Sequence, residues 1–291
     1  MIEQQLINGL MLGSIYALVG VAFSLTIGML NFLNFSVPGL FMLGGVVSYG
    51  LLKAGFHWSI AFVLTIAAIT VVSLVIERFT YRWLRLSSPF IPLVSSIGFL
   101  IVIENSAIMR FGSESMRVPS PFKLTDLHVA GLFISAPQLL GLVIALLAAA
   151  IMSLMLKRSK LGRSIRGIAE NPRTAETLGI NVNRTVSSIY VITGIFAAVG
   201  GILFALNYQQ VAWYMGQEVA AKGLAAMVLG GMGSLWGPVI GGFLVGLIEV
   251  FSIAYVSSDA VNAVVYGTLL ALLLCWPNGL LGARLSTVER M

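Results

Sequence analysis

Residues 157–184 read KRSKLGRSIRGIAENPRTAETLGINVNR, and they form the one long polar and basic segment in an otherwise apolar chain. Seven of these residues are Lys or Arg. The segment predicts a short helix with both ends defined: Asn171 can cap its N-terminus, Pro172 suits its first position and Gly179 suits the residue just past its end. At about two turns, such a helix is too short to be stable alone.

The short helix must therefore form against another surface, and Ala175 and Leu178 are the apolar side chains that offer the contact. That surface is either the rest of this chain or a partner protein on the cytoplasmic side. A third interpretation is an ordinary basic loop, which its charge holds on the cytoplasmic side of a membrane.

The remainder of the chain has the composition of a membrane protein. Of its 291 residues, 58% are hydrophobic and 10% are charged, and the mean hydropathy is +0.97. In soluble domains about a quarter of the residues are charged, so a soluble fold is excluded. The single cysteine, Cys275, allows no internal disulfide and no paired-cysteine metal site. We predict an all-α, polytopic membrane protein with one transmembrane domain over residues 1–291 and a cytoplasmic loop at residues 157–184.

The apolar runs predict nine membrane spans, with eight or ten as alternatives, because about 20 apolar residues are needed to cross. The seventh run is too short to cross as one regular helix. No Lys or Arg precedes the first run, so we expect no cleaved signal peptide. The expected spans are residues 7–29, 37–52, 59–76, 91–109, 139–155, 186–206, 223–233, 239–256 and 261–276.

The basic residues predict the orientation of the chain. With the N-terminus outside and the C-terminus in the cytoplasm, twelve of the 17 Lys and Arg residues lie inside, as the positive-inside rule requires. The five expected outside are Lys53, Arg110, Arg117, Lys123 and Lys222.

Two segments, residues 31–45 (NFLNFSVPGLFMLGG) and 230–242 (GGMGSLWGPVIGG), are apolar but unsuited to a regular helix. Irregular backbone at membrane depth is tolerated only inside protein or beside a wet cavity. One broken segment in each half is typical of transporters with an inverted repeat and a pathway between its halves. The alternatives are a chance likeness and helix packing through small residues four apart, as at Gly9/Gly13 and Gly242/Gly246. The candidate pathway residues here are Asn31, Asn34, Ser36, Gly39, Ser234 and Gly237.

Three acidic residues lie within or beside the expected spans. Glu77 adjoins Arg78, so we expect a solvated surface group. Glu104 and Glu249 lie deeper, where a charge is costly, so each should face the bundle interior, a partner subunit or water. Both are candidate pathway residues, and structural pairing or a position near the interface is the alternative.

Motifs for chemistry within the chain are missing from the sequence. It contains no G-x-x-x-x-G-K-[ST] phosphate loop, no G-x-S-x-G serine site and no H-E-x-x-H zinc motif. We expect no enzyme and no metal site, and His57 and His128 both fall in external loops. Transport remains, powered either by an ion gradient or by another protein that docks at residues 171–179.

The sequence resembles a known family in three blocks: residues 9–32 (GLMLGSIYALVGVAFSLTIGMLNF), residues 162–184 with the following 191–207 (VITGIFAAVGGILFALN), and residues 223–249 (GLAAMVLGGMGSLWGPVIGGFLVGLIE). These blocks are similar to the permease subunits of bacterial branched-chain amino acid ABC importers. Their order along the chain is that of the shorter of the two permease types in such importers. The resemblance implies that residues 161–180 contain the coupling helix, which sits in a cleft of an ATPase subunit. The candidate coupling residues are Ile168, Glu170, Asn171, Pro172, Ala175, Glu176, Leu178 and Gly179.

The same resemblance implies the partners and the place of the chain. It implies a second permease, related or a copy, two ATPase subunits that bind the ATP, and a periplasmic substrate-binding protein. The chain would lie in the lipid of the bacterial inner membrane, with no cofactor of its own and no nucleic acid partner.

One departure from the family leaves the substrate open. After Asn31 and Phe32, family members commonly run A-H-G-E, whereas this chain has Leu33-Asn34-Phe35-Ser36. The family also includes importers of urea and short amides. We expect an amino acid first, branched-chain or otherwise hydrophobic. An ion-coupled secondary carrier and a passive channel for a small neutral solute are the competing classes.

Overall fold

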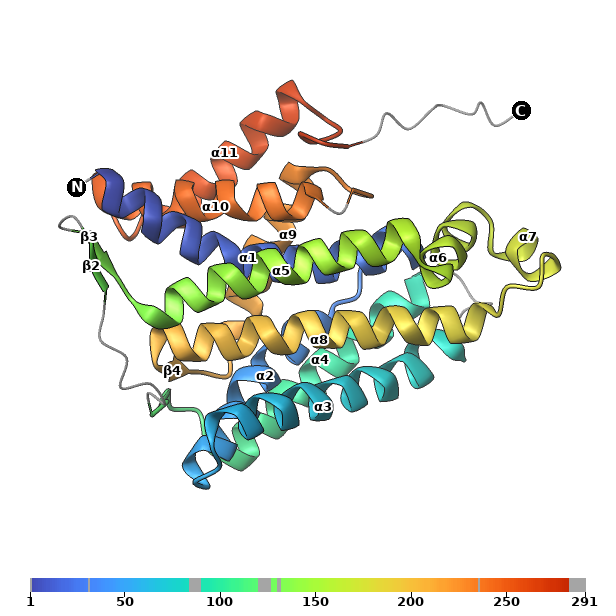
Figure 1. The fold of residues 1–291 in the computed structure, drawn as a ribbon, viewed down its shortest axis with the longest axis horizontal. Helices are drawn as coiled ribbons and strands as arrows, with labels where there is room; N and C mark the ends of the chain where they lie inside the picture. The colour runs from blue at the N-terminus through green and yellow to red at the C-terminus, as the bar shows by residue number, and fades with distance from the viewer. Residues whose placement is uncertain are drawn as a thin grey trace.

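The computed structural model describes residues 2–30, 32–83, 90–119, 127–129, 132–234 and 236–282. The described chain is a bundle of long helices with a few short strands at one end (Figure 1). The all-α expectation is confirmed. The helices are α1 (Ile2–Leu30), α2 (Ser36–Lys53), α3 (Trp58–Glu77), the π-helical turn η1 (Arg78–Arg82), α4 (Phe90–Phe111), α5 (Ala136–Arg158), α6 (Lys160–Glu170), α7 (Pro172–Thr177), α8 (Val182–Tyr208), α9 (Met215–Gly230), α10 (Trp236–Tyr255) and α11 (Val261–Cys275).

The bundle has two distinct ends, which Figure 1 shows at left and right. We call the first the strand end: it holds the start of α1, the turn between α2 and α3, and the strands β1 (Met116–Arg117), β2 (Leu127–Val129), β3 (Leu132–Ile134) and β4 (Gln210–Val211). β1 pairs antiparallel with β4, and β2 with β3. We call the second the basic end, where η1, α6 and α7 lie.

Helix α1 occupies the centre of the bundle and packs against α5, α8, α9 and α10. Its contact with α10 depends on small residues. A Cβ added to Gly13 would lie 2.6 Å from the Cα of Phe243, and one added to Gly246 would lie 2.4 Å from the backbone nitrogen of Gly13. Close approach of helices through small residues is a common way to pack in membranes. The packing interpretation of these glycines is therefore confirmed.

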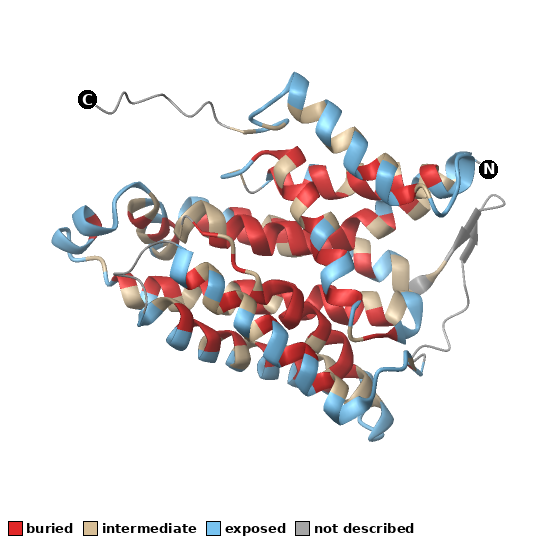
Figure 2. Ribbon diagram, turned by 180° about the vertical axis from the view of Figure 1, so that it is seen from behind, coloured by how far each residue is buried: buried red, intermediate tan, exposed pale blue. Residues whose placement is uncertain are grey.

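The outer helices present apolar side chains to the surroundings. In Figure 2 the buried residues fill the middle of the bundle, and exposed residues follow its periphery. Val63, Val71 and Val75 on α3 are exposed, as are Leu147, Ile151 and Leu154 on α5. Water-soluble proteins do not expose apolar faces of this extent, so these faces contact lipid.

In the described chain, seven helices, counting α3 together with η1, are long and apolar enough to span a membrane. α9, with 16 residues, and α11, with 15, are shorter. Each of the nine expected spans coincides with one helix, but the seventh was misplaced. α9 begins at Met215 rather than at residue 223, so Lys222 lies within a helix and not in an external loop. The charges of Glu218 and Lys222 concealed the first two turns.

The two broken segments are turns that precede helices, not breaks within them. Residues 32–35 lead into α2 and residues 231–234 follow α9, and proline is the third residue of both α2 and α10. Proline in the first turn costs no hydrogen bond, because the N–H groups there have no helical partner. Gly39 is therefore helical, contrary to the expected interruption up to residue 45.

Glu77 is not the solvated surface group that its neighbour Arg78 suggested. Its side chain is buried at the end of α3, which packs against α8, and its Oε1 has no hydrogen-bond partner among the described residues. Nothing in the neighbouring sequence indicates this burial, because it is produced by a helix more than a hundred residues away.

Candidate functional site

Helix α7 has the capped ends that the sequence predicts. The Oδ1 of Asn171 accepts hydrogen bonds from the backbone N–H groups of Arg173 at 3.0 Å and Thr174 at 3.2 Å. At the other end Gly179 has φ +81°, and the N–H of Ile180 donates to the carbonyl of Ala175 at 3.0 Å. This is the Schellman arrangement, which favours glycine because a left-handed residue carries a Cβ penalty.

The two apolar side chains of this short helix point in different directions. Ala175 is buried within the protein, whereas Leu178 is 76% exposed. The expectation that both offer one contact face was wrong, because Leu178 lies in the turn that leaves the helix. α7 therefore packs on its own chain through Ala175, whereas the other residues of the helix are exposed to solvent.

Helix α6, which precedes α7, was missed in the sequence. It is amphipathic: Gly162, Ile165 and Ile168 are buried, and its basic residues are exposed. A Cβ added to Gly162 would lie 2.1 Å from the carbonyl oxygen of Leu156, so only glycine allows this close return of the chain onto α5. The apolar spacing of Ile165 and Ile168 was the available signal.

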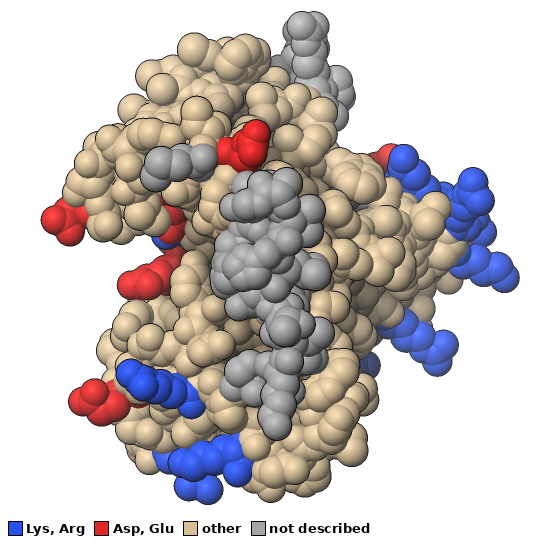
Figure 3. All heavy atoms as spheres, turned by 60° about the vertical axis from the view of Figure 1, so that its left-hand side comes forward, with Lys and Arg blue, Asp and Glu red and all other residues tan. Residues whose placement is uncertain are grey.

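Together the exposed faces of α6 and α7 form what we call the α6–α7 surface. Figure 3 shows Lys and Arg side chains gathered at the end of the molecule where these helices lie. All seven basic residues of 157–184 are exposed, with Leu178 and the acids Glu170 and Glu176 also open to solvent. An exposed leucine amid charges of both signs suits contact with a protein better than a purely solvated loop.

The candidate pathway residues of the first broken segment are buried in protein. Asn34 accepts hydrogen bonds from the N–H of Ser36 at 3.1 Å and from its hydroxyl at 2.6 Å. A Cβ on Gly39 would lie 3.3 Å from the side chains of Leu100 and Ile103 in α4. These contacts fix the start of α2. Asn31 lies outside the described residues.

The second broken segment is also held by its own contacts. The Oγ of Ser234 accepts a hydrogen bond from the N–H of Gly237 at 2.9 Å. A Cβ on Gly237 would lie 2.6 Å from the carbonyl oxygen of Gly230, so the turn closes tightly between α9 and α10. Ser24 of α1 donates to the carbonyl of Ser234 at 3.2 Å. Among the described residues, no hydrogen bond joins Ser234 to Asn34 or Ser36.

The two deep glutamates both face α9. Glu104 on α4 is buried, and the Nε2 of Gln217 donates to its two carboxylate oxygens at 2.8 and 2.9 Å. Gln217 itself is exposed, so this contact lies at the edge of the bundle near the strand end. It joins α4 to α9.

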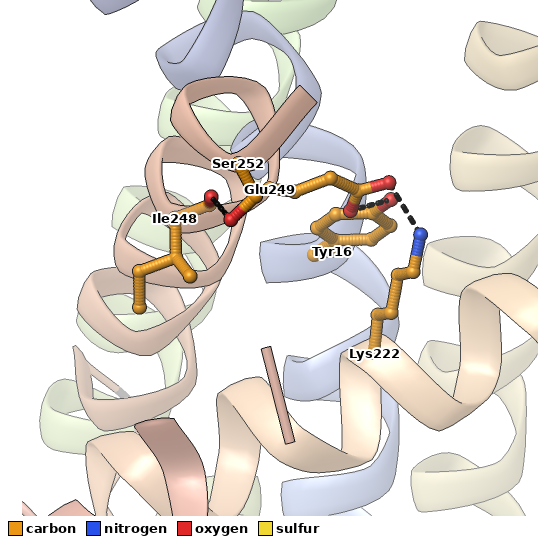
Figure 4. Close-up of polar contacts among 5 residues, drawn as sticks. All are labelled: Tyr16, Lys222, Ile248, Glu249 and Ser252. Atoms are coloured by element: carbon orange, nitrogen blue, oxygen red, sulfur yellow. Dashed lines mark hydrogen bonds and ion pairs between the residues drawn. The ribbon is translucent and has the colours of Figure 1, made fainter. Parts of the chain in front are cut away.

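Glu249 has a more elaborate environment, which Figure 4 shows. The hydroxyl of Tyr16 on α1 donates to its Oε2 at 2.6 Å, and Lys222 on α9 forms an ion pair with its Oε1. The Nζ of Lys222 also lies 5.6 Å from the centre of the Tyr16 ring. The side chains of Lys222 and Glu249 are only 15% and 9% exposed. We call Tyr16, Lys222 and Glu249, with the neighbouring Glu218, the charge cluster.

A pocket of about 340 Å³ adjoins the charge cluster between α9, α10 and α11. Charged, polar and apolar side chains all contribute to its wall. In Figure 3 acidic side chains lie on both sides of a hollow in the left of the view. The lining residues are Glu218, Lys222, Glu249, Ile253, Ser258, Val261, Asn262 and Tyr266.

Sequence reasoning found only Glu249 among these residues. Lys222 and Glu218 were read as part of a loop, yet their spacing of four places opposite charges on one helical face. That spacing was the available signal. Tyr16 gave none, since it is an ordinary aromatic in an apolar run. Within the described chain, no three His, Cys, Asp or Glu side chains gather as a metal site would require.

Comparison with known proteins gives a consistent result. The family described as "Branched-chain amino acid transport system / permease component" matches residues 5–274. The chain is 32% identical over 292 residues to the high-affinity branched-chain amino acid transport system permease protein LivH of Salmonella typhimurium, covering 96% of this chain and 95% of that one. The same values hold for the corresponding protein BraD of Pseudomonas aeruginosa. The probable branched-chain amino acid transport permease protein LivH of Methanocaldococcus jannaschii is 25% identical over 311 residues. That match covers 99% of this chain and 96% of the Methanocaldococcus protein.

Proposed function

The chain belongs to the family of branched-chain amino acid ABC transporter permeases, and from this premise we propose that it forms the membrane passage of an ATP-driven importer for a hydrophobic amino acid. The relatives above are named for branched-chain amino acids, which supports this substrate class over urea or short amides. ATP is hydrolysed by partner subunits, and this chain binds no cofactor of its own.

The observation that carries the proposal is the α6–α7 surface. α7 is capped at both ends, buries Ala175 against its own chain, and has Leu178 and Glu176 exposed to solvent. A helix of six residues with defined ends is a rigid projection that another protein can grip. The sequence has no phosphate-binding loop, so in an ATP-driven importer the energy for transport enters through such a contact.

The expected assembly follows the family. Two ATPase subunits dock on the α6–α7 surfaces of this chain and of a second permease, and a periplasmic binding protein delivers the substrate at the strand end. With nine crossing helices, the N-terminus lies outside the inner membrane and the C-terminus in the cytoplasm. The exposed basic residues of 157–184 are then cytoplasmic, in agreement with the positive-inside rule.

In this mechanism ATP binding draws the two α6–α7 surfaces together, and α5 and α8, which flank this region in the chain, transmit the movement to the bundle. The passage then opens to each side in turn around a fixed site, as in other alternating-access transporters. We place that site at α9, because Glu104 and Glu249, the deep acids of the expected pathway, both bond to side chains of this helix. Asn34, Ser36, Gly39, Ser234 and Gly237 hold the helix starts that must move with it.

Reconstitution in liposomes tests this function. The chain assembled with its ATPase, second permease and binding protein should accumulate amino acid only with ATP. Leu178→Asp should abolish that uptake while leaving the fold intact, because the side chain is exposed. Phe56→Asp, an exposed apolar residue in the turn at the strand end, is the control: it should leave binding of the ATPase subunits unchanged, whereas Leu178→Asp should abolish that binding.

Two results would overturn the proposal. Accumulation by this chain alone on an imposed proton or sodium gradient would make it an ion-coupled carrier. Flux of the solute down its own concentration gradient through this chain alone, without ATP or an ion gradient, would make it a passive channel.

A further inference from the structure

We propose that the pocket between α9, α10 and α11 is the permease's own binding site for a zwitterionic amino acid: Lys222 takes the carboxylate, Glu218 takes the ammonium group, and Ile253 and Val261 contact the apolar side chain. This inference rests on the proposed function and adds to it a site, a ligand charge pattern and a role for each residue.

Charges of both signs stand side by side in the wall of the pocket. Glu218 and Lys222 are four residues apart on α9, so their side chains lie on one face, one above the other. Glu249 enters the same wall from α10. A zwitterion offers one positive and one negative group on adjacent atoms, so both of its charges meet an opposite charge here. A ligand with a single charge would leave one side of this wall unmatched.

The Lys222 ammonium group is held in place and still has hydrogen-bond donors available. An ammonium group has three donors, and Glu249 engages one of them through its Oε1. The other carboxylate oxygen of Glu249 accepts from Tyr16 at 2.6 Å. Glu249 and Tyr16 are therefore positioning residues, which fix the Lys222 ammonium at the edge of the pocket. The remaining donors of Lys222 can bind a substrate carboxylate.

Glu218 is the free charge of the site. It is exposed, it lines the pocket, and its side chain has no hydrogen bond or ion pair among the residues described in the structure. Since Glu249 already neutralises Lys222, Glu218 leaves the site one negative charge in excess. That excess favours a ligand with an ammonium group and disfavours a simple carboxylic acid. The spare donors of Lys222 add a preference for a carboxylate beside that ammonium group.

The remaining wall suits an apolar side chain. Ile253, Val261 and Tyr266 supply apolar surface to the same pocket, and the volume of about 340 Å³ lies at the small end of the range for small-molecule sites. Ser258 and Asn262 lie toward the strand end, near the turn that joins α10 and α11. A ligand can thus enter from the side on which a binding protein would deliver it.

A cysteine-protection experiment tests this site without any partner subunit. The exposed native Cys275 is changed to Ser, Ser258→Cys is introduced as the reporter, and the purified chain in lipid nanodiscs is labelled with a maleimide. L-leucine should slow labelling at least about threefold, the factor expected when its concentration is twice its Kd. 3-Methylbutylamine, which lacks the carboxylate, and 4-methylpentanoate, which lacks the ammonium, should protect far less.

Glu218→Gln identifies the ammonium partner, because this exposed position can change without disturbing the buried ion pair. It should raise the leucine concentration needed for half-maximal protection about tenfold or more. Glu114→Gln, an exposed acid elsewhere at the strand end, is its control. Lys222→Met, combined with Glu249→Leu so that no unpaired charge is left buried, should weaken leucine protection similarly. Lys53→Met is the control for it, since Lys53 also lies 5.6 Å from a tyrosine ring, that of Tyr49, but outside the pocket.

Failure of this inference is separable from failure of the proposed function. If leucine gives no protection, or if the amine or the acid protects equally well, the zwitterion site is wrong even though ATP-dependent uptake is found. If leucine protects as expected but the reconstituted assembly takes up nothing with ATP, the importer is wrong and the site stands.

Discussion

The charge cluster and the α6–α7 surface place charges in opposite circumstances. At the α6–α7 surface, seven basic residues are exposed and solvated, so keeping them charged costs little. In the charge cluster, Lys222 and Glu249 are nearly buried, where a charge without a partner is costly. The comparison teaches that exposed charge leaves a surface available to partners, whereas paired charge fixes the position of three helices.

The largest effect is expected from Glu249→Leu, which breaks the charge cluster. It leaves Lys222 buried without a counter-ion, so the free energy of unfolding should fall by about 3–5 kcal/mol. Thermal unfolding in detergent measures this. The double variant Lys222→Met, Glu249→Leu should recover much of the loss, and a double variant as unstable as the single one would argue against the pairing.

Tyr16→Phe tests the second contact of the same carboxylate. It removes a hydrogen bond to a charged group, and we expect a loss of about 1.5–3 kcal/mol in unfolding free energy. Tyr49→Phe serves as the control, since the ring of Tyr49 also faces a lysine, Lys53, at the strand end. Equal stability of Tyr16→Phe and the parent protein would show that Glu249 does not depend on this hydroxyl.

Gly179→Val carries the comparison to the α6–α7 surface. Valine in the left-handed conformation should cost about 1–2 kcal/mol. Gly55→Val is matched, because Gly55 has φ +87° against +81° for Gly179, and an added Cβ at either meets nothing within 4 Å. Both variants should lose similar stability, but only Gly179→Val should reduce ATP-driven uptake. A similar loss of uptake in both would point to strain alone.

Asn171→Ala should have the smallest effect on stability. It removes the two hydrogen bonds that cap α7, which contribute about 1 kcal/mol. Amide hydrogen exchange at Arg173 and Thr174 should speed up accordingly. Asn181→Ala, which removes the cap of α8, should leave α7 exchange unchanged.

The α6–α7 surface contains features that could be predicted from the sequence alone. The helix at Pro172–Thr177 was found because its cap, its first proline and its final glycine lie within nine residues, and each acts on its own backbone. The nine apolar runs were found for the same reason: membrane crossing is a property of each run by itself. The cap and the helical fold are confirmed by the structure.

The contacts of the charge cluster could not be predicted from local sequence. Tyr16 and Glu249 are 233 residues apart, and nothing near either one indicates the other. The missing turns of α9 have the same cause. The spacing of Glu218 and Lys222 is compatible with a helix, but two charges beside an apolar run indicate a loop until α10 supplies the counter-ion for Lys222. The burial of Glu77 was missed for this reason as well.

The function was predicted from the resemblance to a family and not from local sequence patterns. The residues alone left open an importer, a carrier and a channel, and the resemblance to a family selected among them. The glycines and polar residues of the broken segments prove to be packing and turn contacts, which local composition cannot separate from a pathway lining. For this reason we propose the pathway at α9 and its partners.

The most direct test of the central claim is the accessibility of position 178 in the assembled transporter. In a Cys275→Ser background, Leu178→Cys should react rapidly with a maleimide in the isolated chain, since this position is 76% exposed. We predict that binding of the ATPase subunits blocks this reaction while Phe56→Cys stays reactive. If Leu178→Cys reacts equally fast in the isolated chain and in the assembly, the ATPase subunits do not bind the chain at α7, and the proposed function is contradicted.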